Sequence, residues 1–169
     1  MQKLVMIVLL AIAATPVFAQ CEVMSRIGAD EVLYYHLGYV PFYLTSSKTL
    51  YGGAITDEQN YFLALKPRPF PAKPLGNKLK DDLKVTLSNN EEYSLKHFDN
   101  RYLDYDTSLL FLYVLPEKLL SDFRTYEVVS MKMMMGDEGE RVYTFKQHKS
   151  AIKDQLNCLV ENLERKKRR

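Results

Sequence analysis

Residues 83–95 read LKVTLSNNEEYSL, and this stretch decides the fold class. Apolar and polar residues alternate over residues 83–87 and again over 93–95, which is typical of strands with one buried face. Residues 88–91 lie between them, and their two asparagines tolerate the positive φ angles of a tight turn. The stretch therefore predicts an antiparallel β-hairpin.

Strand-like runs flank this hairpin on both sides. Strands are expected at residues 32–37, 49–55, 61–66, 109–115, 128–135 and 141–145. Gly52-Gly53 interrupts the second run, and Asp30-Glu31 before the first would also suit the start of a short helix. Residues 109–115 are apolar on both faces, which predicts a central strand, and residues 136–139 form a turn between the last two.

Two helices are expected in the second half of the chain. Pro116 and an acidic neighbour suit the first turn of a short helix over residues 116–123. An amphipathic helix is predicted over residues 147–165, with an apolar stripe formed by Ile152, Leu156, Leu159 and Leu163. Such a stripe must be buried against another element. The predicted fold class is therefore α+β, an antiparallel β-sheet with the C-terminal helix packed on one face.

Four prolines in residues 67–74 predict an extended connection without regular helix or central strand. An intradomain surface loop accounts for this composition. The alternative is a docking segment for an aromatic groove of a partner, because polyproline segments are recognised in that way.

Residues 1–19 have the features of a signal peptide. Lys3 precedes an apolar run over residues 4–14, and Val17-Phe18-Ala19 provides small residues for cleavage after Ala19. The run is about half of the ~20 residues that span a bilayer. We therefore expect a periplasmic or secreted protein, with residues 20–169 as one domain and no transmembrane segment after cleavage. Polar Gln20 argues against a lipid anchor on the next residue.

Charge and composition limit the classes of binding partner that we expect for this protein. Removing Lys3 leaves 22 basic residues against 21 acidic ones, which gives no electrostatic reason to expect nucleic acid. The 12 tyrosines suit half-buried strand surfaces or, alternatively, an exposed binding face. The basic tail at residues 165–169 complements the helix dipole and would also suit contact with anionic lipid or glycan.

The chain has two cysteines, Cys21 and Cys158. In an oxidising compartment two cysteines usually pair, so a structural disulfide is predicted. A redox-active thiol is the alternative, but no Cys-x-x-Cys pair is present to lower a thiol pKa.

Two segments contain side chains that can do chemistry. Met131, Met133 and Met135 alternate along one strand, which suits Cu(I) binding or ordinary core packing. The polar segment at residues 97–108 offers candidate site residues, which are His97, Asp99, Asp104 and Asp106. His97 and Asp99 suit an acid–base pair, whereas a solvated loop with turns explains the same composition. The calcium-loop pattern that begins at Asp104 lacks its glycine and closing glutamate, and no metal or other cofactor is predicted.

A wider pattern is carried by the runs DLKVTLSNNEEYSL, LFLYVLPEKLLSDF, VVSMKMMMGDEGERVYTF and AIKDQLNCL. They give a polar-tipped hairpin, a Y-x-L-P helix start, a strand and a closing helix that ends near a cysteine. Over roughly residues 80–160 the chain resembles small uncharacterised exported proteins of Bacteroidetes-type bacteria. The resemblance implies a periplasmic or secreted location, and it carries over no site residues.

These observations favour an exported non-enzymatic binding or structural domain, because no catalytic signature is present. Its partner would be a protein or an envelope or glycan component. The alternative is an envelope hydrolase or metal-handling protein that uses His97, Asp99, Asp104 and Asp106. An enzyme requires these side chains to converge in a concave pocket.

Overall fold

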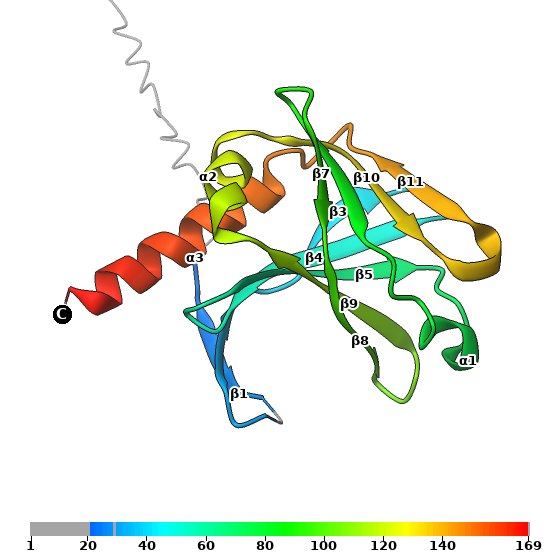
Figure 1. Cartoon of the computed structure of the whole chain (residues 1–169), viewed down its shortest axis with the longest axis horizontal. Coiled ribbons are helices and arrows are strands. Elements are labelled where there is room, and N and C mark those ends of the chain that lie inside the picture. Colours follow the sequence, from blue (N-terminus) through cyan, green and yellow to red (C-terminus); the bar gives the residue numbers. More distant parts are fainter. Residues whose placement is uncertain (1–20, 29, 169) are drawn as a thin grey trace, which may run out of the picture.

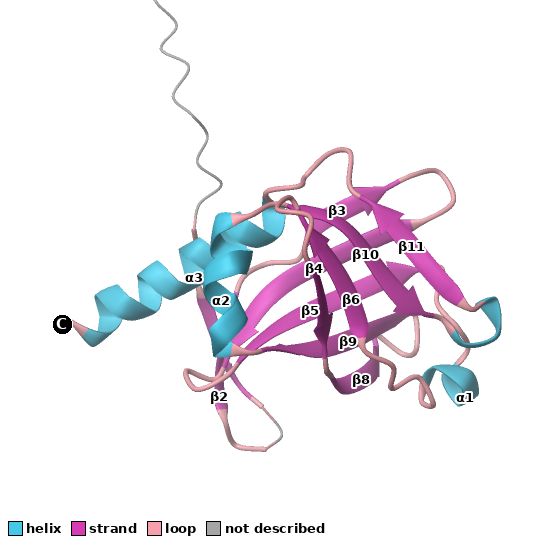
Figure 2. Ribbon diagram, turned by 45° about the horizontal axis from the view of Figure 1, so that its top comes forward, coloured by secondary structure: helices cyan, strands magenta, loops and turns pink. Residues whose placement is uncertain are grey.

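Two antiparallel sheets face each other across one hydrophobic core (Figure 1). The computed structural model describes residues 21–28 and 30–168. Helices α2 and α3 lie together on one side of the sheets, and α1 lies on the opposite side (Figure 2).

The larger sheet has seven strands in the described chain, in the order β1-β2-β4-β5-β9-β8, with β3 also paired to β4. Its strands are β1 (Met24–Ile27), β2 (Leu33–His36), β3 (Val40–Leu44), β4 (Thr49–Thr56), β5 (Tyr61–Arg68), β8 (His97–Leu103) and β9 (Ser108–Leu115). One edge of β4 is shared, because β3 pairs with residues 49–52 and β2 with residues 55–56. Strand β9 lies between β5 and β8, so the prediction of a central strand at residues 109–115 is confirmed.

The smaller sheet contains the hairpin that the sequence predicts most directly. Its order is β11-β10-β6-β7, formed by β11 (Glu140–Thr144), β10 (Val128–Met134), β6 (Leu83–Leu87) and β7 (Glu92–Leu95). Strands β6 and β7 pair with Leu83 opposite Leu95, and Asn90 in their turn has a φ of 68°. The predicted hairpin is therefore confirmed.

The helices are α1 (Lys73–Gly76), α2 (Glu117–Thr125) and α3 (Ala151–Lys167), with a 3-10 turn η1 (Gly136–Glu138) between β10 and β11. Helix α3 packs on β4, β3 and α2. All four residues of its predicted apolar stripe are buried. The predicted α+β class, with the C-terminal helix packed on the sheet, is confirmed. The basic tail continues this helix to Lys167, and the Lys166 ammonium lies over the ring of Tyr35.

Side chains from both sheets form the core. It includes Leu63 and Phe111 of the larger sheet and Leu83 of the smaller one. Met131 and Met133 of β10 are fully buried in the same cluster, and Met135 follows them at 1% exposure. The three thioethers thus pack in the interior, as an ordinary core strand requires.

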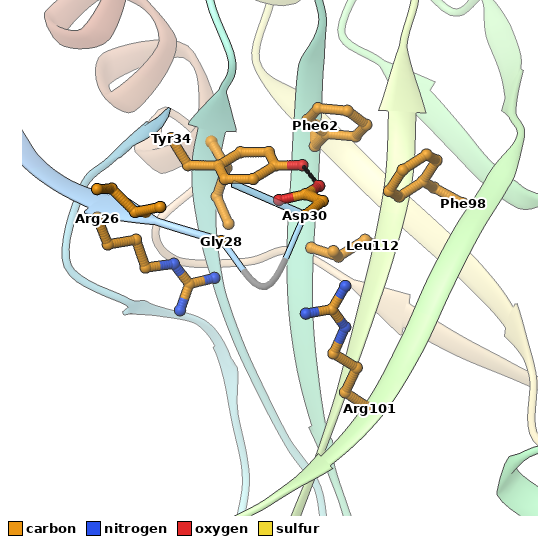
Figure 3. A pocket seen from close by; sticks show the side chains of 10 residues that line it. Arg26, Gly28, Asp30, Tyr34, Phe62, Phe98, Arg101 and Leu112 are labelled. Carbon is orange, nitrogen blue, oxygen red and sulfur yellow. Dashed lines mark hydrogen bonds between the residues drawn. The ribbon is translucent and has the colours of Figure 1, made fainter. Parts of the chain in front are cut away.

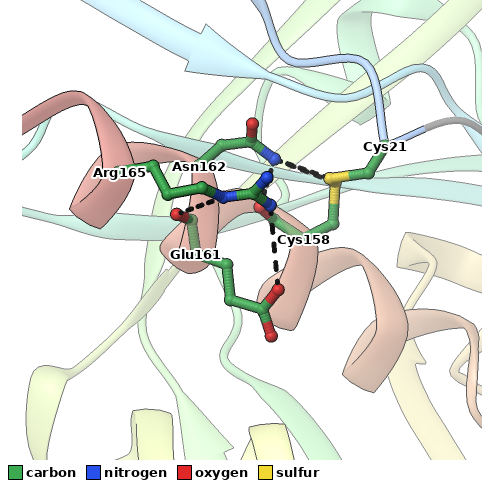
Figure 4. Close-up of a disulfide and its surroundings, with 5 residues drawn as sticks. All are labelled: Cys21, Cys158, Glu161, Asn162 and Arg165. Carbon is green, nitrogen blue, oxygen red and sulfur yellow. Dashed lines mark hydrogen bonds and ion pairs between the residues drawn. A yellow bond between two sulfur atoms is a disulfide. The ribbon is translucent and has the colours of Figure 1, made fainter.

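Cys21 and Cys158 form a disulfide, as predicted (Figure 4). Their Cα atoms are 5.6 Å apart, and the bond ties the start of the described chain to the middle of α3. The side-chain amide of Asn162, one turn further along α3, donates to the Cys158 carbonyl at 2.9 Å. The disulfide therefore attaches the segment that leads into β1 to the C-terminal helix α3, although the two are far apart in the sequence.

Three strands were not predicted, which are β1, β3 and β8. The interpretation of residues 97–103 as a solvated loop is wrong, because β8 pairs with β9 from His97 to Leu103. Its register shifts between His97 and Asp99, so the alternation that marks a strand is interrupted in the sequence. Only the next four residues, 104–107, form a turn, and the first three of them have a positive φ.

The glycine and proline positions correct two further expectations. Strand β4 continues through Gly52-Gly53. A side chain at Gly52 would overlap the Phe42 ring, so the glycine there allows Phe42 to pack closely against the strand and does not interrupt it. Strand β5 continues through Pro67, which lies opposite Leu50. Pairing of β5 with β9 ends at Leu65, so the missing N–H of Pro67 costs no bond there.

The other end of the proline segment also differs from the expectation of an extended connection. Pro74 stands in the first turn of the short helix α1, a position where proline needs no N–H partner. Asp30-Glu31 starts no helix, since β2 follows as a strand. The predicted signal peptide, residues 1–19, lies outside the described residues. No helix within residues 21–28 and 30–168 is long and apolar enough to cross a membrane.

Candidate functional site

A pocket lies on the face of the larger sheet that points away from the core between the sheets. Its floor is apolar and consists of Ile55 of β4, Phe62 of β5 and Leu112 of β9. These residues alternate along their strands with core residues, so the sheet is apolar on both faces here. Phe98 of β8 adds a wall, with its ring centroid 4.9 Å from that of Phe62.

The β1–β2 hairpin forms the opposite wall (Figure 3). It contributes Arg26, Ile27, Gly28, Asp30 and Tyr34 to the lining. The cavity has a volume of about 170 Å³, and we call it the hairpin pocket. The pocket thus has an apolar floor with polar side chains on its walls, and polar groups that fix the orientation of a ligand over an apolar surface are a common feature of small-molecule sites.

A hydrogen bond fixes the ionisation of two lining residues. The Tyr34 hydroxyl donates to Asp30 Oδ2 at 2.7 Å. This bond is the main cause that lowers the pKa of Asp30, and the same bond raises the pKa of Tyr34. At neutral pH the hairpin wall therefore presents a carboxylate and a neutral phenol.

Two guanidinium groups stand at the pocket, one from each wall (Figure 3). Arg101 of β8 is paired with the Asp99 carboxylate two residues earlier. Arg26 of β1 forms no ion pair with any described residue. A guanidinium binds carboxylate, sulfonate or phosphate oxygens through paired N–H groups. The pocket thus combines an apolar floor with an anion-binding group that has no acidic partner in the described chain.

The structure does not gather the acidic residues that the sequence singled out. Each carboxylate has a partner of its own: Asp99 pairs with Arg101, Asp104 accepts from the Ser108 hydroxyl, and Asp106 pairs with Lys73. Within the described residues, no three His, Cys, Asp or Glu side chains are placed to hold a metal ion. Of the four candidates, none lines the hairpin pocket.

His97 is instead a packed ring at the start of β8. It meets the ring of Tyr113 edge-on, with centroids 6.0 Å apart, and its Nε2 atom is buried without a hydrogen-bond partner. Burial is the largest influence and lowers the pKa of His97, while the charge of Asp99 opposes this shift. The imidazole therefore resists protonation in the folded state.

We expect the free energy of unfolding to fall as the pH drops through the ordinary histidine pKa of 6.5, because the unfolded chain then binds a proton that buried His97 resists. His97→Phe keeps an aromatic ring and should reduce this loss between pH 7 and pH 5. Urea unfolding of both proteins across this range checks the prediction.

Carboxylates titrate in a separate window. The pKa of three described residues, Asp30, Asp57 and Asp82, lies below the ordinary 3.8. A side-chain hydrogen bond is the largest cause at Asp30 and Asp82, whereas at Asp57 burial is the largest influence and raises the pKa, but several hydrogen bonds together outweigh it. The contribution of these carboxylates is therefore lost only at more acidic pH. Parallel pH profiles for the wild type and His97→Phe between pH 7 and pH 5 would contradict the role assigned to His97.

Sequence reasoning missed the pocket residues for two reasons. Phe98 and Arg101 lie in the segment that was interpreted as a loop, and Arg26 lies in the unpredicted strand β1. The signal that could have found them is the aromatic and aliphatic content of residues 97–103, which suits a strand despite its Asp and Asn. A comparison of the chain with known protein families, curated proteins and solved structures finds no match to any of them.

Proposed function

We propose that this protein is an exported, non-enzymatic binding domain whose hairpin pocket takes a small amphipathic anion. The observation that carries the proposal is the guanidinium of Arg26, which forms no ion pair within the described residues and stands beside an apolar floor. An aromatic or aliphatic body would pack on Phe62 and Phe98, and its anionic group would bind Arg26. The disulfide and the signal-like residues 1–19 support an oxidising, extracytoplasmic location.

The hydrolase or metal-handling alternative has less support. It requires His97, Asp99, Asp104 and Asp106 to act together, whereas the three carboxylates are held by different partners. Among the described residues that line the hairpin pocket, Asp30 is the one carboxylate, and it accepts a hydrogen bond from Tyr34 of the same wall.

The proposal can be tested with naphthoate, an aromatic carboxylate, and with naphthalenemethanol, its uncharged counterpart. We expect Arg26→Gln to weaken naphthoate binding about tenfold, because one charge-assisted interaction is lost, and to leave naphthalenemethanol binding unchanged. Binding would be followed by ligand fluorescence and by amide chemical shifts around Phe98.

Arg68→Gln is the matched control, since Arg68 is exposed at the end of β5 and does not line the pocket. Its naphthoate affinity should equal that of the wild type. Equal affinities for the two compounds, or an equal loss in Arg26→Gln and Arg68→Gln, would contradict an anion site. Chemical shifts confined to other surfaces would contradict the location.

A further inference from the structure

The two sheets are connected along one side and open along the other. On the closed side, chain segment 95–97 passes directly from β7 to β8, and the Val114 N–H donates to the Lys96 carbonyl at 2.9 Å. On the open side, β3 and β11 do not pair with each other. A groove of about 340 Å³ runs between these two strands, and we call it the β3–β11 groove.

Strand β11 turns unused backbone groups toward this groove. Residues Phe145 and Met135 donate their N–H groups to Val129 and Gly139, which fixes the alternation of bonded and non-bonded pairs along β10 and β11. By that alternation Arg141 and Tyr143 bond to β10, while the N–H and C=O of Val142 and Thr144 point away from it. Both of these residues line the groove.

The other edge strands carry a proline, a register shift or very short length, whereas the one feature of β11 that discourages pairing is the inward-pointing charge of Arg141. Strand β3 contains Pro41 and a register shift between Pro41 and Tyr43. Strand β8, the last strand of the larger sheet, has a register shift between His97 and Asp99. Strands β1 and β7 have only four residues each. Prolines, bulges and short length are devices that protect sheet edges from pairing. Strand β11 keeps an unbroken five-residue register with β10 and contains no proline.

The side chains of the groove define the chemistry of an occupant. Leu44 is 51% exposed and Val142 is 46% exposed, although both are apolar. Lys146 and His148 lie just beyond the C-terminal end of β11, and the lining contains no carboxylate. Glu140 stands at the other end of the strand. The edge is thus apolar in the middle, basic at one end and acidic at the other.

We propose that β11 is a strand-addition site for an extended peptide segment of another protein. The segment would lie antiparallel to β11, with alternating apolar side chains against Leu44 and Val142 and an acidic residue at its N-terminal end near Lys146. Backbone hydrogen bonds supply affinity in this mode, and alternate side chains supply specificity. The site is separate from the hairpin pocket, and the inference does not depend on the function proposed for that pocket.

The test uses an acetylated and amidated hexapeptide with the sequence Glu-Val-Thr-Val-Thr-Lys. We expect it to shift the amide resonances of Val142 and Thr144 and to leave those around Phe98 unchanged. Thr144→Pro removes one outward N–H and should weaken binding about fivefold, whereas Thr144→Ala keeps that N–H and should bind like the wild type. The reversed sequence would place lysine beside Lys146 and should bind more weakly.

A second measurement leaves the protein unchanged. A peptide with N-methyl groups at its two valines cannot add as a strand and should produce no shift at β11, which tests the proposal even if Thr144→Pro does not fold. Equal binding of the N-methylated or reversed peptide would overturn the proposal. Concentration-dependent dimerisation through β11, with no response to peptide, would identify the occupant as a second copy of the chain and would also overturn it.

Discussion

Replacing Cys158 by alanine is expected to lower the free energy of unfolding by about 5 kcal/mol, because it removes a cross-link that constrains almost the whole unfolded chain. The disulfide joins residues 137 positions apart in sequence. In the chain-entropy model the effect grows with the logarithm of the loop length, which places this bond near the upper end of its range. Urea unfolding under non-reducing conditions measures the loss.

The controls separate the cross-link from the side chain. Cys21→Ala should lower stability by a similar amount although Cys21 is exposed, because either replacement breaks the same loop. The double variant should be no less stable than Cys158→Ala alone, and reductant should destabilise only the wild type. A Cys21→Ala variant as stable as the oxidised wild type would show that the bond contributes little, and the chain-entropy account would then fail for this protein.

The elements found from the sequence are those with a short-range pattern. The hairpin at residues 83–95 alternates with period two and carries turn residues in the right place, and both properties can be read within a few positions. The stripe from Ile152 to Leu163 repeats at helical spacing, so α3 was found with its buried face. The disulfide could be predicted because the chain has two cysteines and an oxidising compartment was expected, where two cysteines usually pair.

The elements that were missed depend on contacts far away in the sequence. Strand β8 has the bulge at Phe98 that breaks its alternation, and pairing with β9 decides its structure. Strand β3 contains Pro41, and proline argues against a strand unless the strand lies at the edge of a sheet. The edge position of β3 follows from its pairing with β4 alone, which the local sequence does not show. The division into two sheets is equally non-local, since β7 and β8 are adjacent in sequence and belong to different sheets.

The hairpin pocket could not be predicted for the same reason. Its two arginines are 75 positions apart, at Arg26 and Arg101, and the floor comes from three further strands. Residue types in one segment, such as the acidic residues 99–106, suggested a site because they are close in sequence. Their side chains have separate partners in the fold, so proximity along the chain was a poor guide to convergence.

The break in the larger sheet makes Gln155 a structural residue. Strand β4 changes partner between Gly52, opposite Val40 of β3, and Ile55, opposite His36 of β2. At this break the buried Ala54 N–H donates to Gln155 Oε1 at 2.8 Å. The amide nitrogen of Gln155 donates in turn to the Gly38 carbonyl at 3.0 Å. One side chain of α3 thus replaces the missing strand pairing, and it connects the helix to both segments.

Gln155→Met is therefore expected to lower the free energy of unfolding by about 2 kcal/mol, because it keeps the volume but leaves the buried Ala54 N–H without an acceptor. Gln155→Ala should cost about 3 kcal/mol, since it also leaves a cavity beside Ala54. Gln147→Ala is the matched control, because Gln147 is exposed and forms none of these bonds. The Ala54 amide should lose hydrogen-exchange protection in both Gln155 variants and keep it in the control. A Gln155→Met protein with wild-type stability and a protected Ala54 amide would show that another group satisfies the break in the sheet.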